Sequence, residues 1–326
     1  MRRAIILLCS FVASLALIAV PASADYPDKT VTVVVSGPAG GPLDAVTRLV
    51  FDKLRERLHD APVVIENKPG AGGILAVTSV TRAQPDGYAL LSTIDPPIVA
   101  TPSLVSSVPY DPLKDLVPVA MLGDGGDNLL IVPADSPAKS VQDLVAWMRA
   151  HPDQANFSSS GNGGPGHLLG ELFNREAGTK ALHIPHKGAP EQLNALLAGR
   201  VTFGFVPAGL ALPQVKAGKV RALAVASAER TPLLPDLPTV AESGVKGFRP
   251  VHWWIIVFAP AKTPKDLVQQ LNREIVAATQ TPRVAELLRK QGLHPSSDAP
   301  EKVAERVQHD VHYWSRVIRE LGIHAD

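Results

Sequence analysis

The stretch that decides the fold is VTVVVSGPAGGPLDA, residues 31–45. Its first five residues, Val31 to Val35, are all β-branched and predict a short buried strand. The segment 36–44 is rich in glycine and proline and predicts a loop. An amphipathic helix is expected next, with one apolar face formed by Ala45, Leu49, Leu54 and Leu58. Strand, glycine loop and helix in this order are typical of parallel α/β units.

The same order recurs along the chain. Strands are expected at 63–65 and 88–91, then in a second series at 128–132, 156–160, 182–185, 201–206 and 222–226. The apolar strand 253–258 leads back to the first series, and helices at about 265–280 and 300–321 close the chain. We therefore predict an α/β protein of two lobes, each a mostly parallel sheet flanked by helices, with two crossovers. Lobe 1 would comprise 25–127 plus 253–326, and lobe 2 would comprise 128–252.

The N-terminus has the pattern of a secretory signal peptide. Arg2 and Arg3 precede an uncharged apolar run, 5–20, and a small-residue cleavage site at 22–24. The run is shorter than the ~20 residues that span a membrane. We expect cleavage after residue 24 and a periplasmic protein. The single cysteine, Cys9, would leave with the leader.

Composition excludes several classes of function. Lys+Arg number 32 and Asp+Glu 31, and aromatic residues make up 5%, so neither a basic surface nor base stacking supports nucleic-acid binding. The ten histidines are scattered without H-E-x-x-H or a cysteine pair, so we expect no metal site. No cofactor is expected.

Two glycine loops are the candidate ligand-binding elements. Each stands between a strand and a helix, where free N–H groups bind a carboxylate without a positive side chain. The alternative for the first loop is an ordinary tight turn with Asp44 as a helix cap. The second loop adds hydroxyl groups, and one loop per lobe would hold a ligand from two sides. The first comprises Gly40, Gly41, Pro42, Leu43 and Asp44, and the second Ser159, Ser160, Gly161, Gly163, Gly164 and His167.

Other motifs in the sequence are weaker evidence for a function. Gly161, Gly163 and Gly166 match G-x-G-x-x-G, but the acidic residue expected about 20 positions later is missing, which argues against a dinucleotide. G-x-S-x-G is absent, so the nearby serines and histidines do not form a nucleophile elbow. A third glycine loop, 67–73, favours strand–helix packing over ligand contact.

The chain resembles the Bug family, the periplasmic receptors of tripartite tricarboxylate transporters, from Tyr26 to about Ile323. The resemblance rests on short motifs in a fixed order: YPDK (26–29), PAGG (38–41), ENKPGAGG (66–73), PDGY (85–88), PYDP (109–112), SGNG (160–163), LPTVAESG (237–244) and APA (259–261).

The resemblance implies a periplasmic binding protein-like clamp that closes on a small carboxylate. It implies a monomer that serves inner-membrane transporter subunits or a sensor. It places Gly40, Gly41 and Asp44 in one half of the site and Ser159 to Gly164 with His167 in the other, with Thr93 a weaker candidate. The family commonly has an acid or amide where Val206 stands, so we expect Val206 to disfavour a ligand amino group. His186 and Ile256 also depart from the family pattern.

Two other functions remain open at this point. An exported hydrolase acting on a small carboxylate would need a nucleophile with an adjacent base, and the sequence shows no such set. An adhesion or structural module would not be stabilised by a small molecule. Binding without chemistry is therefore the leading hypothesis.

Overall fold

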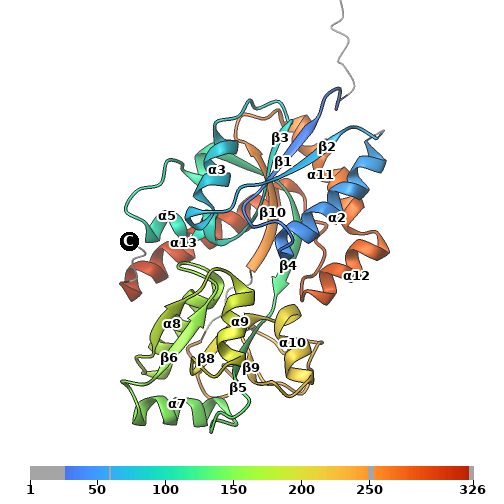
Figure 1. The fold of residues 1–326 in the computed structure, drawn as a ribbon. Coiled ribbons are helices and arrows are strands. Elements are labelled where there is room, and N and C mark those ends of the chain that lie inside the picture. Colours follow the sequence, from blue (N-terminus) through green and yellow to red (C-terminus); the bar gives the residue numbers. More distant parts are fainter. Residues whose placement is uncertain (1–25, 59, 249–252, 323–326) are drawn as a thin grey trace, which may run out of the picture.

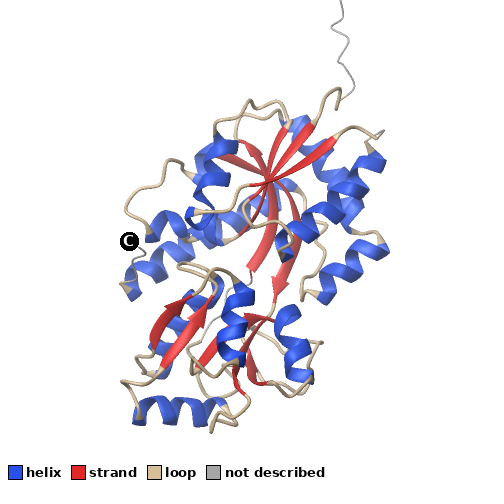
Figure 2. Ribbon diagram, in the orientation of Figure 1, coloured by secondary structure: helices blue, strands red, loops and turns tan. Residues whose placement is uncertain are grey.

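A computed structural model describes residues 26–58, 60–248 and 253–322. The predicted signal peptide and its cleavage site lie outside these residues. Among the residues described, no helix is both long enough and apolar enough to cross a membrane. Two separate sheets, each enclosed by helices, form an upper and a lower lobe (Figures 1 and 2).

The first sheet has the order β2-β1-β3-β10-β4. The β-branched run 31–35 forms β1, which pairs in parallel with β2 and β3. β10 is inserted antiparallel between β3 and β4. The bounds are β1 (Val31–Val35), β2 (Val63–Asn67), β3 (Ala89–Ile94), β4 (Leu116–Gly126) and β10 (Trp253–Pro260).

Helices cover both faces of this sheet because alternate strand residues point to opposite sides. Side chains of α2, α11 and α12 pack with Val33, Ile255 and Val257 on one face. Side chains of α3, α4, α5 and α13 pack with Trp254 and Ile256 on the other. The bounds are α2 (Pro42–Arg57), α3 (Ile74–Thr81), α4 (Pro96–Val99), α5 (Thr101–Leu104), α6 (Pro112–Asp115), α11 (Lys265–Thr279), α12 (Pro282–Lys290) and α13 (Pro300–Leu321), with a short 3₁₀ turn, η2 (Ala71–Gly73).

The second sheet repeats this plan with the order β7-β6-β8-β5-β9. β6 pairs in parallel with β7 and β8, whereas β5 runs antiparallel to β8 and β9. Clusters between the sheet and its helices contain α7 and α8 on one face and α9 and α10 on the other. The bounds are β5 (Asn128–Pro133), β6 (Asn156–Ser159), β7 (Leu182–Pro185), β8 (Phe203–Pro207), β9 (Val220–Val225), α7 (Val141–Ala150), α8 (Pro165–Ala177), α9 (Ala189–Leu197) and α10 (Ala208–Lys216).

The predicted two-lobed α/β architecture is confirmed, with one difference in the sheets. Each sheet is mixed, because the strand adjoining the crossover enters it antiparallel. The long strand β4 and the helices α4, α5, α6, α10 and α12 were not predicted. Asp127 alone joins β4 to β5 and forms one crossover.

The strand directions place both glycine loops at the crossover edges of their sheets. β10 enters the first sheet from the second crossover and runs antiparallel to β3, so β1 and β3 end where β10 begins. β5 directly follows Asp127 and runs antiparallel to β8, so β8 and its parallel neighbour β6 end at that edge too. The loops that follow β1 and β6 therefore lie on the sides of the lobes nearest each other.

The lobes also touch directly. Leu168 of α8 packs into the cluster formed by α3, α4, α5 and α13 of the other lobe. A Cβ atom added to Gly163 would lie 2.5 Å from the Cδ1 atom of Leu104 in α5. Arg175 of α8 forms an ion pair with Glu320 of α13, with a distance of 3.5 Å between Nη1 and Oε2.

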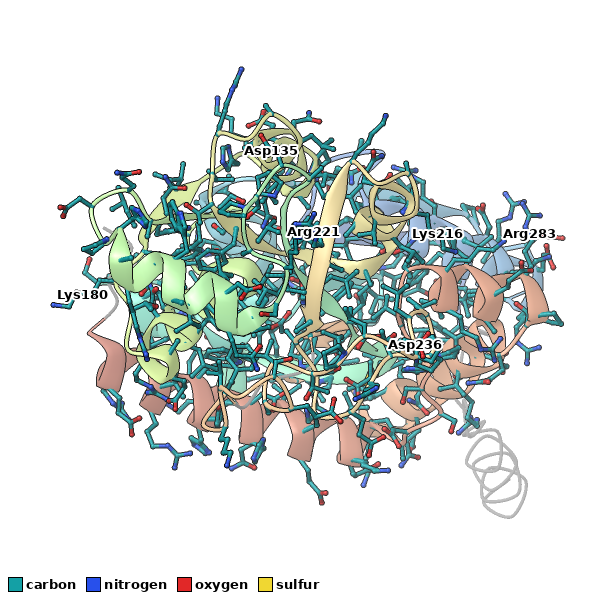
Figure 3. The ribbon with its side chains drawn as sticks, turned by 90° about the horizontal axis from the view of Figure 1, so that it is seen from below. Asp135, Lys180, Lys216, Arg221, Asp236 and Arg283 are labelled. Carbon is teal, nitrogen blue, oxygen red and sulfur yellow. The ribbon has the colours of Figure 1, made fainter. Side chains whose placement is uncertain are left out.

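Arg221 lies on β9, the edge strand of the second sheet (Figure 3). Its guanidinium donates hydrogen bonds to the carbonyl oxygens of Ala134, Ser136 and Ala138. These bonds tie the segment that leads into α7 to the edge strand.

Candidate functional site

Asp44 organises the first loop. Its carboxylate, which is buried, accepts hydrogen bonds from the Gly40 N–H at 2.8 Å, from Arg48 Nε at 3.0 Å and from Asn67 Nδ2 at 2.9 Å. Burial alone would raise the pKa of Asp44, but the hydrogen bonds from Arg48, Gly40 and Asn67 outweigh it and hold the pKa below its ordinary value. The buried Asp44 side chain thus holds the first loop in place through these hydrogen bonds.

The loop leaves two backbone donors at the start of α2. The Gly40 N–H is used by Asp44, the Gly41 N–H donates to the Pro38 carbonyl at 3.2 Å, and Pro42 has none. The N–H groups of Leu43 and Asp44 have no acceptor within the helix. Gly40 has a φ of +76°, and an added Cβ would meet nothing within 4 Å, so its backbone is open on that side.

Hydroxyl groups line the ends of β1 and β3. Thr93 is fully buried, and its Oγ1 lies 2.8 Å from the Oγ of Ser36, which directly follows β1. The predicted candidate Thr93 is therefore next to the first loop. Ser36 was missed, although its position between a strand and a glycine loop is the signal that would have found it.

The third loop braces the first. Asn67 Nδ2 donates to the Gly37 carbonyl at 3.1 Å as well as to Asp44. Gly73, at a φ of +92°, lies so close to α4 that an added Cβ would be 2.4 Å from Pro97 Cγ. The glycines of this loop thus serve close packing, as the sequence favoured.

Ser159 and His183 form a hydrogen-bonded pair in the second loop. Ser159 Oγ lies 2.6 Å from His183 Nε2 and also contacts the backbone of Gly161. The Gly163 N–H donates to His167 Nδ1 at 3.0 Å, and the Gly164 N–H donates to the Gly161 carbonyl at 3.3 Å. The five predicted residues of this loop that make these bonds are therefore brought together, and His183 joins them from β7.

The two imidazoles stack on each other. The ring centroids of His167 and His183 are 3.8 Å apart, and Phe157 stacks on His183 at 5.0 Å. Burial lowers the pKa of His167 to about 4, and burial together with the charges of His167 and His186 lowers the pKa of His183 to about 3. Both rings are neutral at ordinary pH and bring no positive charge to a ligand.

Two other predicted residues, Ser160 and Val206, do not belong to this hydrogen-bonded group. Ser160 is partly buried, and its carbonyl accepts the Gly188 N–H at 3.2 Å. Val206 is fully buried in the apolar cluster under α9 and α10, opposite Leu129 of β5. A ligand contact at Val206, and its effect on an amino group, stay predictions that this packing does not support.

In the part of the chain that the structure describes, no group of three or more His, Cys, Asp or Glu side chains is arranged to hold a metal ion. What the loops offer is two helix N-termini, at α2 and α8, with backbone donors and hydroxyls. That chemistry suits an anion that lacks a cationic partner.

Residues 46–323 match the family described as the tripartite tricarboxylate transporter family receptor. The chain belongs to this family. The resemblance to Bug proteins is also confirmed: BugT of Bordetella pertussis is 34% identical over 324 residues, 99% of this chain and 98% of BugT.

Two solved structures agree with this chain in fold. A Rhodopseudomonas palustris protein with adipate is 32% identical with a TM-score of 0.84, and the match covers 92% of this chain and 99% of that one. MatC of the same species, with bound malate, is 34% identical with a TM-score of 0.81, over 90% and 100% of the two chains. Both are similar to this chain along nearly its whole length.

Proposed function

We propose that the protein is a periplasmic solute-binding receptor that captures a small dicarboxylate between its lobes and delivers it to a tripartite tricarboxylate-type transporter. The observation that carries this proposal is the pair of strand–loop–helix units at the crossover edges, one per lobe. Membership of the receptor family and the adipate and malate of two relatives support the ligand class.

Each loop would bind one side of the ligand. The Leu43 and Asp44 N–H groups at the start of α2 would hold a carboxylate from the first lobe. The second loop would hold it from the other lobe with Ser160 and the backbone at the start of α8. Because the histidines are neutral, hydrogen bonds and helix dipoles supply the attraction. A ligand that contacts both lobes stabilises the closed arrangement.

Binding without chemistry is favoured over catalysis. The pair Ser159–His183 is the observation that would favour a hydrolase, since it joins a hydroxyl to a base. However, Ser159 is fully buried, and its Oγ also bonds the Gly161 backbone. The family and the structural neighbours are solute-binding proteins, which supports the same choice.

Several finer assignments belong to this proposal. The leader would be removed after residue 24, and the lobes would comprise 25–127 plus 253–326 and 128–252. The mature protein would act as a monomer with inner-membrane transporter subunits, or report the ligand to a sensor.

A thermal-shift screen of the mature protein tests the function. Ligand at about 100 times its dissociation constant adds roughly 2.7 kcal/mol, or about 5–10 °C in a chain of this size. We expect shifts with adipate, succinate or malate and none with neutral sugars, on protein unfolded and refolded to remove bound ligand. A flat response to every carboxylate would contradict the proposal.

A further inference from the structure

Asp95 is a buried residue whose carboxyl group has one oxygen without a hydrogen-bond partner. Only 5% of the residue is exposed, and its Oδ1 has no partner in the structure. A buried acceptor costs free energy unless it receives a hydrogen bond. A bound ligand could supply the hydrogen-bond donor that Asp95 Oδ1 lacks.

The local sequence prevents Asp95 from acting as a helix cap. It precedes α4, where an aspartate ordinarily accepts hydrogen bonds from N–H groups of the first turn. Pro96 and Pro97 fill the first two positions and have no N–H, and the Ile98 N–H donates to the Asp95 backbone carbonyl at 2.9 Å. The Asp95 side chain makes no capping hydrogen bond.

Neighbouring charges do not neutralise it either. Arg306 of α13 is bonded to Asp310 at 2.8 Å and to Asp124 at 3.2 Å. Burial, with the charges of Asp310 and Asp124, raises the pKa of Asp95 well above its ordinary value despite Arg306. In either protonation state, a carboxyl group keeps an oxygen that accepts a hydrogen bond.

Asp95 stands at the edge where the ligand would bind. It directly follows β3, two residues after Thr93, whose hydroxyl meets Ser36 of the first loop. Pro97 is close enough that a Cβ on Gly73 would touch it, and the same Cβ would lie 3.6 Å from Ser36 Cβ. The adjacent strand β10 begins at the same edge of the sheet.

We propose that Asp95 is a specificity-determining residue that accepts a hydrogen bond from a hydroxyl or ammonium group beside the ligand carboxylate. This inference rests on the proposed function and names the ligand feature that the site selects. A site built around such an acceptor discriminates strongly against an analogue without the donor, because the acceptor is then left unsatisfied. Shape and charge alone would not separate these analogues.

Calorimetric titration of the mature, ligand-stripped protein with malate, aspartate and succinate tests this. Succinate lacks the donor, which malate supplies as a hydroxyl and aspartate as an ammonium, so the preferred ligand identifies the group. We expect malate or aspartate to bind at least roughly 10-fold more tightly than succinate. In Asp95→Ala the preference should fall to within about threefold.

Two further variants sharpen the result. Asp95→Asn keeps the shape and one acceptor oxygen, so it should retain most of a preference for malate. Asp86→Ala removes an exposed carboxyl of the same lobe that Lys29 partners, so the preference for malate or aspartate over succinate should stay as in the wild type. Equal binding of succinate by the wild type, or an unchanged preference in Asp95→Ala, would overturn the role of Asp95 and leave the receptor function standing. Failure of every dicarboxylate to bind would overturn the receptor function itself.

Discussion

His167 and His183 show how single residues can shape a binding loop without contributing charge. Each is held neutral by burial, and each makes a hydrogen bond that fixes part of the second loop. The His167 Nδ1 accepts a hydrogen bond, which assigns its proton to Nε2, 3.9 Å from Glu171 Oε1. The His167 ring therefore acts as an acceptor, and both rings act as hydrogen-bonded stacking surfaces.

The lowered pKa of His167 has a consequence for stability. Below about pH 6.5 the unfolded chain takes up a proton that the folded protein does not, until the pH falls to about 4. The free energy of unfolding should therefore decrease across this window, by roughly 3 kcal/mol from His167 alone, and be unaffected above it. Urea unfolding between about pH 7.5 and about pH 4.5 measures this.

His167→Asn provides the comparison, because the Asn oxygen can still accept the Gly163 N–H. The variant should lose stability less steeply than the wild type as the pH falls. Identical slopes for the two proteins would show that His167 is protonated in the folded state.

The sequence predicted the two candidate loops but not the residues that they contact. The loops around Gly40 and Gly163 were recognisable because strand, glycine and helix signals are local. Asn67, which braces Asp44 from 23 positions away, and His183, which bonds Ser159, were missed because such partners depend on strand order. Asp95 was missed for the same reason.

At the scale of elements, α8 is set against β6 by a glycine. A Cβ on Gly170 would lie 2.1 Å from Phe157 Cε2, so the helix can approach the sheet only without a side chain there. Alanine favours an isolated helix over glycine by about 1 kcal/mol, but overpacking should dominate. We expect Gly170→Ala to lower the free energy of unfolding by about 1–3 kcal/mol in urea titration.

Gly209→Ala in α10 is a matched control, since the three atoms nearest its new methyl group all belong to the other lobe. Ligand-free Gly209→Ala should be as stable as the wild type. If Gly170→Ala has the same free energy of unfolding as the wild type, the Phe157 side chain can move to make room for the methyl group.

Strong periodicity made most elements predictable, whereas α12 and three other kinds of element were missed. The strand β4 contains Pro118 and several glycines, which read as a loop, yet β10 pairs with it along its length. The helices α4, α5 and α6 are single turns with a proline in their first two positions, and they are too short for a periodic pattern. Pro213 lies inside α10 and concealed that helix.

At the scale of the whole molecule, α10 and α12 form a contact beside the crossover. A methyl group on Gly209 would lie 2.9 Å from Gln291 Cα and 3.1 Å from the Lys290 carbonyl. Backbone atoms yield less than side chains, so Gly209→Ala should force the lobes apart there. If the ligand bridges the lobes, we expect binding to weaken by about 5–30-fold, which corresponds to 1–2 kcal/mol.

Calorimetry gives the affinity of Gly209→Ala, and small-angle scattering gives the radius of gyration with and without ligand. Gly170→Ala serves as the reference that alters packing inside one lobe only. Unchanged affinity in Gly209→Ala would show that the α10–α12 contact yields on closure.

The helices α2 and α8 both begin at the edge that each lobe turns toward the other, and each brings the same electrical pole. With nothing between them, these like poles oppose the approach of the lobes. A negatively charged ligand bound between them, as proposed, would reverse the sign of that force and act as the counterion that lets the lobes close. An uncharged molecule of the same shape would leave the repulsion between the helix ends in place. A transporter that docks only with closed receptors would then not receive a neutral ligand.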